Sequence, residues 1–190
     1  MLDSKQAEMM IYNYGLVPDQ VRLNEVSNMY ELRIGILRPF LTNMFLHCVL
    51  GHLISNMWIL FIFGDNVEDR MGKIRYFLFY ITCGLLASFT HFVLYRNSPV
   101  PAIGASGAIS GVMAAYMFMF PKSTILSLVP IIIIPLFIPI PAVIYIGLWF
   151  VGQLLSGTSS LMLSNAATGI AFWAHIGGFI SGLLLYRYFD

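Results

Sequence analysis

One feature of the charge distribution constrains this chain more than any other: no acidic residue occurs between Met71 and Phe189. All nine Asp and Glu residues lie in residues 3–31, in residues 65–69 or at the final position, Asp190. A soluble domain needs charged side chains over its whole surface, yet this chain is 58% hydrophobic and only 10% charged, with a mean hydropathy of +0.80. The pattern therefore predicts several membrane spans joined by short loops.

The remaining composition narrows the class further. The formal net charge of +1 gives no reason to expect nucleic acid or an acidic partner. Cys48 and Cys83 each lie in an apolar run, so we expect buried free thiols. The first 20 residues carry acids early and lack the basic-then-apolar order of a secretory signal peptide, so we do not expect one.

Five apolar segments are candidates for the spans, and a helix needs about 20 apolar residues to cross the hydrocarbon. The third segment has only about 14, so it should begin part-way into the membrane, where protein or water surrounds its free end. The fourth follows a proline-interrupted stretch that we expect to be irregular or interfacial. The expected fold class is all-α, a polytopic transmembrane helical bundle of about five spans. In order, the segments are Pro39–Phe63, which the charged loop 64–75 closes, Tyr76–Tyr95, Ser106–Pro121, the part of 123–156 that starts near Pro141, and Gly169–Tyr186.

Basic residues in short loops predict the orientation, because such loops stay preferentially on the cytoplasmic side. Loops on one side would carry five basic residues, and loops on the other side would carry Arg96 alone. The N-terminal stretch would then face outward with three arginines, a conflict that a further span before residue 1 would resolve. The five residues are Arg70, Lys73, Arg75, Lys122 and Arg187, and the three are Arg22, Arg33 and Arg38.

Polar side chains inside spans are expensive and mark either function or a specific packing need. Ser106 stands among small residues at the start of the short third segment, where free backbone N–H groups can hold a developing negative charge. His175 opens the last span and could take the serine proton as a general base. For each residue alone a structural role stays open: a glycine-rich packing face for Ser106, a capping hydrogen bond for His175.

Glycines at a spacing of four residues suggest how these two side chains could meet. Small residues at this spacing let two helices touch backbone to backbone. If the glycine faces of the third and last spans pack together, Ser106 and His175 come to the same depth. No carboxylate is placed to complete a triad, so the predicted arrangement is a dyad. The packing glycines are Gly107 and Gly111 on one helix and Gly178 and Gly182 on the other.

Three more histidines and Asn56 lie in or near the first two spans. His52 and Asn56 are four residues apart, so they share one helix face and could donate two hydrogen bonds to an oxyanion; an interhelical polar clamp is the alternative. His47 lies five residues before His52 and should point elsewhere. His91 is expected to pack or snorkel near a span end. No acid or thiol spacing supports a metal site, so none is expected.

Together these residues resemble the rhomboid family of intramembrane serine proteases, over most of the chain from Tyr14 to Tyr186. The resemblance rests on His52-x-x-x-Asn56, the loop GDNVEDRMG, the run from Gly104 to Gly107, and the motif AHxxGxxxG that contains His175. Four motifs in the order and spacing of the family are far more specific than any one of them.

The resemblance implies a catalytic site. Ser106 would be the nucleophile and His175 the general base, while Asn56 and His52, with Gly104 and the Ser106 backbone N–H, would hold the oxyanion. The four glycines would allow close packing. Glu68 and Arg70 match a structural loop pair.

The resemblance also implies partners and a location. Substrates would be transmembrane segments of membrane proteins, cut near the outer face without a cofactor. Residues 1–38 would form an outer or interfacial segment and residues 39–190 the transmembrane protease domain. A bacterial inner membrane is the expected location.

The sequence departs from the family in two ways. The family core has six spans, and no apolar run precedes the segment YGLVPDQ, so either the chain begins downstream of its native start or it works with five. Some members place an aromatic residue four positions after the serine to support the histidine; here the position is Ser110, so other packing must hold His175.

Two other classes of protein compete with a protease. One is a catalytically silent relative that escorts membrane proteins, although such relatives typically lose the serine or the histidine. The other is a transporter with broken helices. Transporters usually show repeated halves and an ionisable residue at mid-membrane; no internal repeat is evident in this sequence, and the charge-free spans argue against an ion path.

Overall fold

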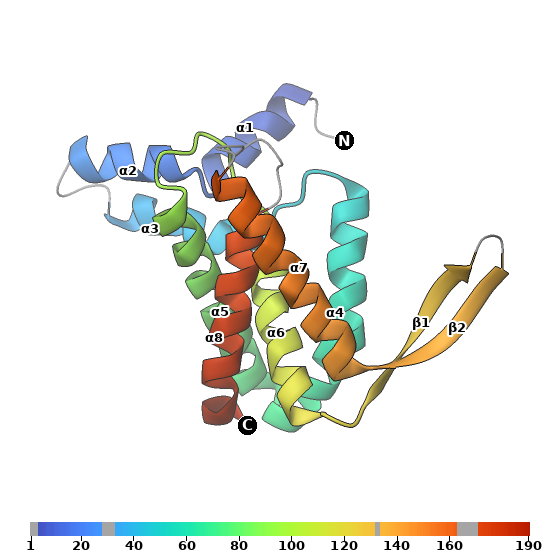
Figure 1. Ribbon diagram of the computed structural model, residues 1–190. Helices are drawn as coiled ribbons and strands as arrows, with labels where there is room; N and C mark the ends of the chain where they lie inside the picture. The colour runs from blue at the N-terminus through green and yellow to red at the C-terminus, as the bar shows by residue number, and fades with distance from the viewer. Residues whose placement is uncertain (1–3, 28–32, 132–133, 163–170) are drawn as a thin grey trace.

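The computed structural model describes residues 4–27, 33–131, 134–162 and 171–190. Five helices form a bundle, three shorter helices lie across one end of it, and a β-hairpin projects from its side near the other end (Figure 1). The elements are α1 (Ser4–Tyr14), α2 (Pro18–Ser27), α3 (Arg33–Thr42), the short 3-10 helix η1 (Asn43–Phe45), α4 (Leu50–Met71), α5 (Lys73–Leu94), α6 (Ser106–Met119), β1 (Thr124–Ile131), β2 (Ile134–Pro141), α7 (Ala142–Met162) and α8 (Phe172–Phe189).

The bundle helices have the character of membrane segments. By length and composition α5 and α7 can each cross a membrane, and the bent pair Leu37–Phe45 and Leu50–Met71 can count as a third span. Large apolar side chains cover the outside of the bundle, including Phe61, Phe77 and Leu148, which are 60–72% exposed. Such a surface suits lipid rather than water. The prediction of a polytopic helical membrane bundle is confirmed.

Helix α6 is the centre of the bundle. It packs against α4, α5, α7 and α8, and all but a few of its side chains are buried, from Gly107 to Met119. Val112, Ala114 and Ala115 are completely buried among residues such as Phe63 and Phe179. Because neighbouring helices surround it, this 14-residue helix can begin below the membrane surface without exposing its free amides to lipid.

The first predicted span has the wrong limits. Helix α3 contains Pro39 and ends at Thr42, and the chain turns by 87° before α4 begins at Leu50. After Thr42 the chain forms the 3-10 turn Asn43–Phe45, and Leu46 and Val49 have extended backbone conformations, so the helix cannot run straight through this region. The charged segment predicted as a loop is mostly helical, because Glu68 and Arg70 are good helix formers and can continue α4 beyond the apolar zone. The helix stops at Gly72, whose positive φ of 79° ends it.

The stretch expected to be irregular is an antiparallel hairpin of β1 and β2. In β2 the prolines Pro135, Pro139 and Pro141 are separated by four and by two residues, so all three lie on the same side of the alternating strand. Along an antiparallel strand, the backbone N–H groups point alternately toward the partner strand and away from it. Prolines an even number of residues apart can therefore all lie where the N–H would point away from β1, so they remove no hydrogen bond between the strands. This register lets a proline-rich segment form a strand, and it removes donors from the outer edge of β2.

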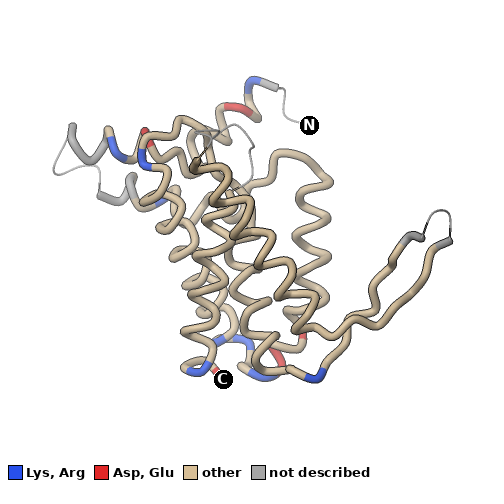
Figure 2. The backbone as a smooth tube through the Cα atoms, viewed as in Figure 1, with Lys and Arg blue, Asp and Glu red and all other residues tan. Residues whose placement is uncertain are grey.

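Charged residues separate toward the two ends of the bundle (Figure 2). At the end where α4 and α8 finish, Arg70 donates two hydrogen bonds to the Asp190 carboxylate, at 2.7 and 3.0 Å. The predicted structural partner of Arg70 was Glu68, but the pairing joins α4 to the end of the chain instead. Helices α1 to α3 lie at the opposite end (Figure 1).

Candidate active site

The site begins at a sharp turn before α6. Gly104 has a φ of 121°, a conformation that side chains rarely adopt. Its N–H donates to the Asn43 carbonyl oxygen at 2.9 Å, which ties the turn to the 3-10 helix before α4. Helix α6 then starts at Ser106, so the serine stands in the first turn, where amide N–H groups have no partner within the helix.

The structure brings Ser106 and His175 together from the starts of α6 and α8. His175 Nε2 lies 2.7 Å from Ser106 Oγ, a hydrogen-bond distance. Both side chains are partly buried. The two residues are 69 positions apart in sequence, so packing of the helices creates the pair.

The predicted glycine contacts surround this pair. A Cβ atom on Gly178 would overlap the Gly107 carbonyl oxygen, and one on Gly182 would overlap the Gly111 carbonyl oxygen. A Cβ on Gly107 would lie 2.7 Å from the Cβ of Ala87, so α5 also presses on α6. The backbones of α6 and α8 therefore touch along two helical turns, as small residues at this spacing allow.

Helix α7 supports the other side of the histidine. His175 Nδ1 lies 2.7 Å from Gln153 Oε1, and the Trp149 ring centroid lies 5.9 Å from that of His175. Residues four apart share a helix face, so α7 directs an amide and an indole to the same ring. Ser110 instead bonds the Ser106 carbonyl oxygen. Sequence reasoning missed Gln153, although an amide in the apolar run of α7 is the kind of polar residue that marks a site.

A cavity of about 140 Å³ opens beside the pair. Its polar lining includes Ser106, His175 and Asn56, and its apolar walls include Trp149 of α7 and Ile59 of α4. The space is therefore bounded by α4 on one side and by α6, α7 and α8 on the others. It is large enough for a small group next to Ser106 Oγ.

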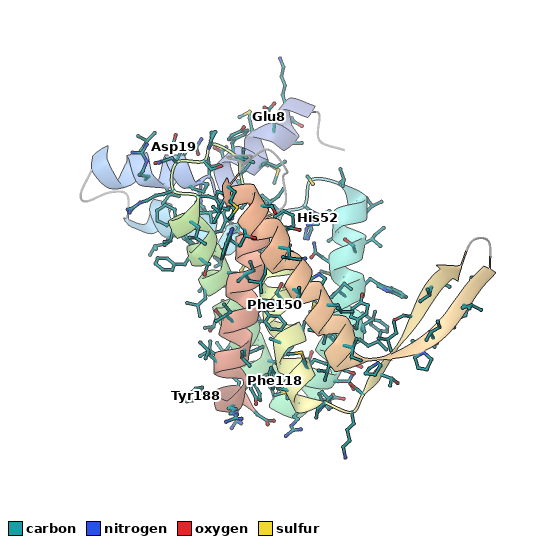
Figure 3. The ribbon with its side chains drawn as sticks, viewed as in Figure 1. Glu8, Asp19, His52, Phe118, Phe150 and Tyr188 are labelled. Carbon is teal, nitrogen blue, oxygen red and sulfur yellow. The ribbon has the colours of Figure 1, made fainter. Side chains whose placement is uncertain are left out.

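Of the residues predicted to hold an oxyanion, Asn56 and Ser106 line this cavity, whereas His52 and Gly104 do not. Asn56 is buried, and its Nδ2 donates to the His52 carbonyl oxygen at 3.0 Å, which leaves its second N–H hydrogen. The His52 ring lies against Gly104, and a Cβ there would be 2.9 Å from its Nε2. Figure 3 shows His52 projecting from α4 toward the other helices. Gly104 cannot be a donor as predicted, because its N–H already bonds Asn43; it contributes space instead.

The prediction that His47 points away from His52 is wrong. Their ring centroids are 5.0 Å apart in an edge-to-face arrangement. The prediction assumed one continuous helix, whereas α4 begins only at Leu50. Within the described part of the chain, no three His, Cys, Asp or Glu residues are grouped to hold a metal.

The fold and the site define a class: a polytopic helical membrane protein with a serine–histidine pair at the start of a short buried helix. Comparison with protein families gives a match to the Rhomboid domain over residues 35–189. The chain belongs to the rhomboid family.

Curated relatives are similar at modest identity. RHOMBOID-like protein 12, mitochondrial, of Arabidopsis thaliana is 26% identical over 172 residues, which are 82% of this chain and 47% of that protein. The human Presenilin-associated rhomboid-like protein, mitochondrial, is 26% identical over 79% of this chain and 37% of its own length. Rhomboid protease GluP of Bacillus subtilis (strain 168) is 38% identical over 79 residues, 42% of this chain and 15% of that protein. The chain thus spans less than half of each of these relatives.

Proposed function

We propose that this chain is an intramembrane serine endopeptidase that cuts transmembrane segments of other membrane proteins near the outer face of the bilayer. The observation that carries the proposal is the 2.7 Å contact between Ser106 Oγ and His175 Nε2 at the start of a short, enclosed helix. A serine hydroxyl becomes an effective nucleophile when an adjacent base accepts its proton. Family membership and the bacterial relative named a rhomboid protease support a hydrolytic role.

In the proposed reaction, His175 Nε2 accepts the Ser106 proton as Oγ bonds to the scissile carbonyl carbon. The tetrahedral intermediate collapses when the C–N bond breaks, and protonated His175 gives its proton to the leaving amine. His175 then takes a proton from water as the water oxygen bonds to the acyl carbon, and it gives that proton to Ser106 Oγ as the ester C–O bond breaks and the new carboxyl end leaves. In each half of the reaction, His175 therefore acts first as a base and then as an acid, and Ser106 and His175 together form a catalytic dyad.

The developing negative charge needs donors that are already in place. In this proposal, Asn56 Nδ2, His52 Nε2 and the Ser106 backbone N–H supply them. Asn56 and Ser106 both line the cavity, and the His52 ring is held against Gly104. The first-turn position of Ser106 adds the positive end of the α6 dipole.

The enclosed cavity suggests how a substrate is presented. A helix keeps its carbonyl groups in hydrogen bonds, so a transmembrane substrate must unwind locally before Ser106 can attack. The cavity of about 140 Å³ suits small residues beside the scissile bond. We therefore expect the preferred substrates to be transmembrane helices that unwind easily and carry small side chains next to the scissile bond.

The proposal includes a location and a division of the chain. We place the protein in a bacterial inner membrane, with the basic end of the bundle in the cytoplasm. The bacterial relative supports this location, whereas the plant and human relatives carry "mitochondrial" in their names. Residues 1–38 form the outer or interfacial segment and residues 39–190 the protease domain, with α3 running across the division.

Cleavage in a bilayer tests the proposal. Purified protein is reconstituted in proteoliposomes with a panel of single-span proteins that carry small, helix-destabilising residues near one end, and fragment masses are measured. We expect the wild type to cut near the outer end and Ser106→Ala and His175→Ala to cut nothing. Ser181→Ala is the matched control, since its buried hydroxyl bonds only the Gly177 carbonyl oxygen of its own helix. Equal cleavage by wild type and Ser106→Ala would contradict the proposal, and no cleavage by a folded wild type would support the silent escort.

A further inference from the structure

We propose that Gln153 is a positioning residue that fixes the tautomer and orientation of His175. The inference rests on the proposed function, because it concerns the same histidine. His175 is held at both ring nitrogens: Nδ1 lies 2.7 Å from Gln153 Oε1, and Nε2 lies 2.7 Å from Ser106 Oγ. The ring is thus suspended between α7 and α6.

The proton positions follow from the chemistry of the partners. A side-chain carbonyl oxygen only accepts hydrogen bonds, so the contact with Gln153 Oε1 requires a proton on Nδ1. A neutral imidazole then has its lone pair on Nε2, which faces the Ser106 hydroxyl and can accept its proton. The opposite tautomer would set the Nδ1 lone pair against the amide oxygen and would leave Nε2 unable to act as a base. In the orientation that it has here, with Oε1 toward the ring, Gln153 therefore favours the reactive tautomer.

The environment explains why an amide occupies this position. The chain has no acidic residue from Met71 to Phe189, and a charged side chain inside a span is costly. An amide orients the imidazole through a hydrogen bond without adding a buried charge. When His175 gains the serine proton, Nδ1–H still donates to Oε1, whose partial negative charge favours the imidazolium.

Gln153 does not act alone in holding the ring. Trp149 lies one helical turn before it, and its ring is 5.9 Å from the His175 ring and 6.4 Å from the Phe179 ring. The indole limits tilting of the imidazole, while the amide fixes its rotation. Helix α7 thus supplies the support that Ser110 of α6 cannot provide, because Ser110 Oγ bonds the Ser106 carbonyl oxygen.

Two measurements on the full chain in detergent test the inference. The first is the ¹⁵N spectrum of histidine-labelled protein, in which His175 is assigned from the spectrum of His175→Ala and its tautomer is read directly. The second is the rate constant for labelling of Ser106 by a fluorophosphonate. Gln153→Leu removes the acceptor, Gln153→Glu restores one at the same reach, and Thr158→Val is the control, because that hydroxyl bonds only its own helix.

We expect wild type and Gln153→Glu to hold the proton on Nδ1. Gln153→Leu should lose this preference and label about tenfold more slowly, the effect of one hydrogen bond, and Thr158→Val should match wild type. Gln153→Met repeats the test if the leucine variant does not fold. An Nδ1–H tautomer unchanged in Gln153→Leu, or an Nε2–H tautomer in wild type, would overturn the inference. The tautomer readout does not need activity, so absent labelling with a tautomer that depends on Gln153 would refute the proposed function and leave this inference standing.

Discussion

Gly178 on α8 lies directly against Gly107 on α6, so close that a side-chain carbon at position 178 would overlap the Gly107 carbonyl oxygen. Ser106 is the residue before Gly107, and His175 lies three residues before Gly178. The backbone contact therefore sets the separation of the two helix starts, and with it the 2.7 Å distance between Ser106 Oγ and His175 Nε2. Packing and chemistry depend on the same two glycines.

A bulky residue at position 178 should disturb both the packing of α8 on α6 and the contact between Ser106 and His175. Gly178→Val forces α8 away from α6, and we expect a loss of about 1–3 kcal/mol in the free energy of unfolding, because an overfilled contact strains the backbone. The rate of fluorophosphonate labelling should fall as well. Thermal unfolding in detergent checks the first effect. Gly147→Val in α7 is the control, since a Cβ there meets nothing within 4 Å; equal stability of the two variants would refute the close-packing argument.

The turn before the serine should be equally intolerant of a side chain. Gly104→Ala places a Cβ 2.8 Å from the His52 ring and in a backbone conformation of φ 121°, which costs of order 1–3 kcal/mol. We expect labelling to slow by about tenfold or more, because Ser106 and His52 shift relative to each other. Gly51→Ala, at an open position of α4, should label like the wild type. Normal labelling of Gly104→Ala would show that this turn does not shape the site.

Removal of the Asn56 amide tests the proposed oxyanion donor. We expect Asn56→Ala to lower the rate of substrate cleavage by about 10²-fold, the usual effect of one such donor, with little change in substrate affinity. Ser55→Ala is a matched control, because Ser55 Oγ and Asn56 Nδ2 both bond the His52 carbonyl oxygen. If both variants lose the same activity, Asn56 acts only through its hydrogen bond within α4 and does not donate to the oxyanion.

The pair between Arg70 and Asp190 should matter for stability and not for catalysis. It joins the end of α4 to the end of the chain, and the side chains are 47% and 28% exposed. Exposed ion pairs contribute roughly 0.2–1 kcal/mol, so we expect a double-mutant cycle of Arg70→Gln and Asp190→Asn to give a coupling in that range that declines with salt. Labelling of Ser106 should stay constant. A large loss of labelling in either variant would contradict this expectation and show that the ion pair affects the reactivity of Ser106.

The sequence was most informative where packing and polarity leave strong patterns. The lack of acids between Met71 and Phe189 predicted the membrane bundle, and the glycines at a spacing of four predicted the contact of α6 with α8. The start of α6 at Ser106 followed from the break before it. Each of these signals reflects one physical requirement that few residue types can meet.

Other features were not predictable from local patterns. The contact of His47 with His52 depends on the 87° bend before α4, which long-range packing sets. The hairpin of β1 and β2 depends on the parity of its prolines, which a count of breakers overlooks. Gln153 meets His175 only because α7 packs beside α8, and no spacing along the chain links the two residues.

The most direct test of the central claim, that His175 activates Ser106, is intact-mass analysis of the purified protein after treatment with a fluorophosphonate. Activation of Ser106 by His175 predicts one adduct per chain on the wild type, mapped to Ser106 by peptide sequencing, and none on Ser106→Ala or His175→Ala. An adduct on another serine, or equal labelling of Ser106 in wild type and His175→Ala, would contradict it.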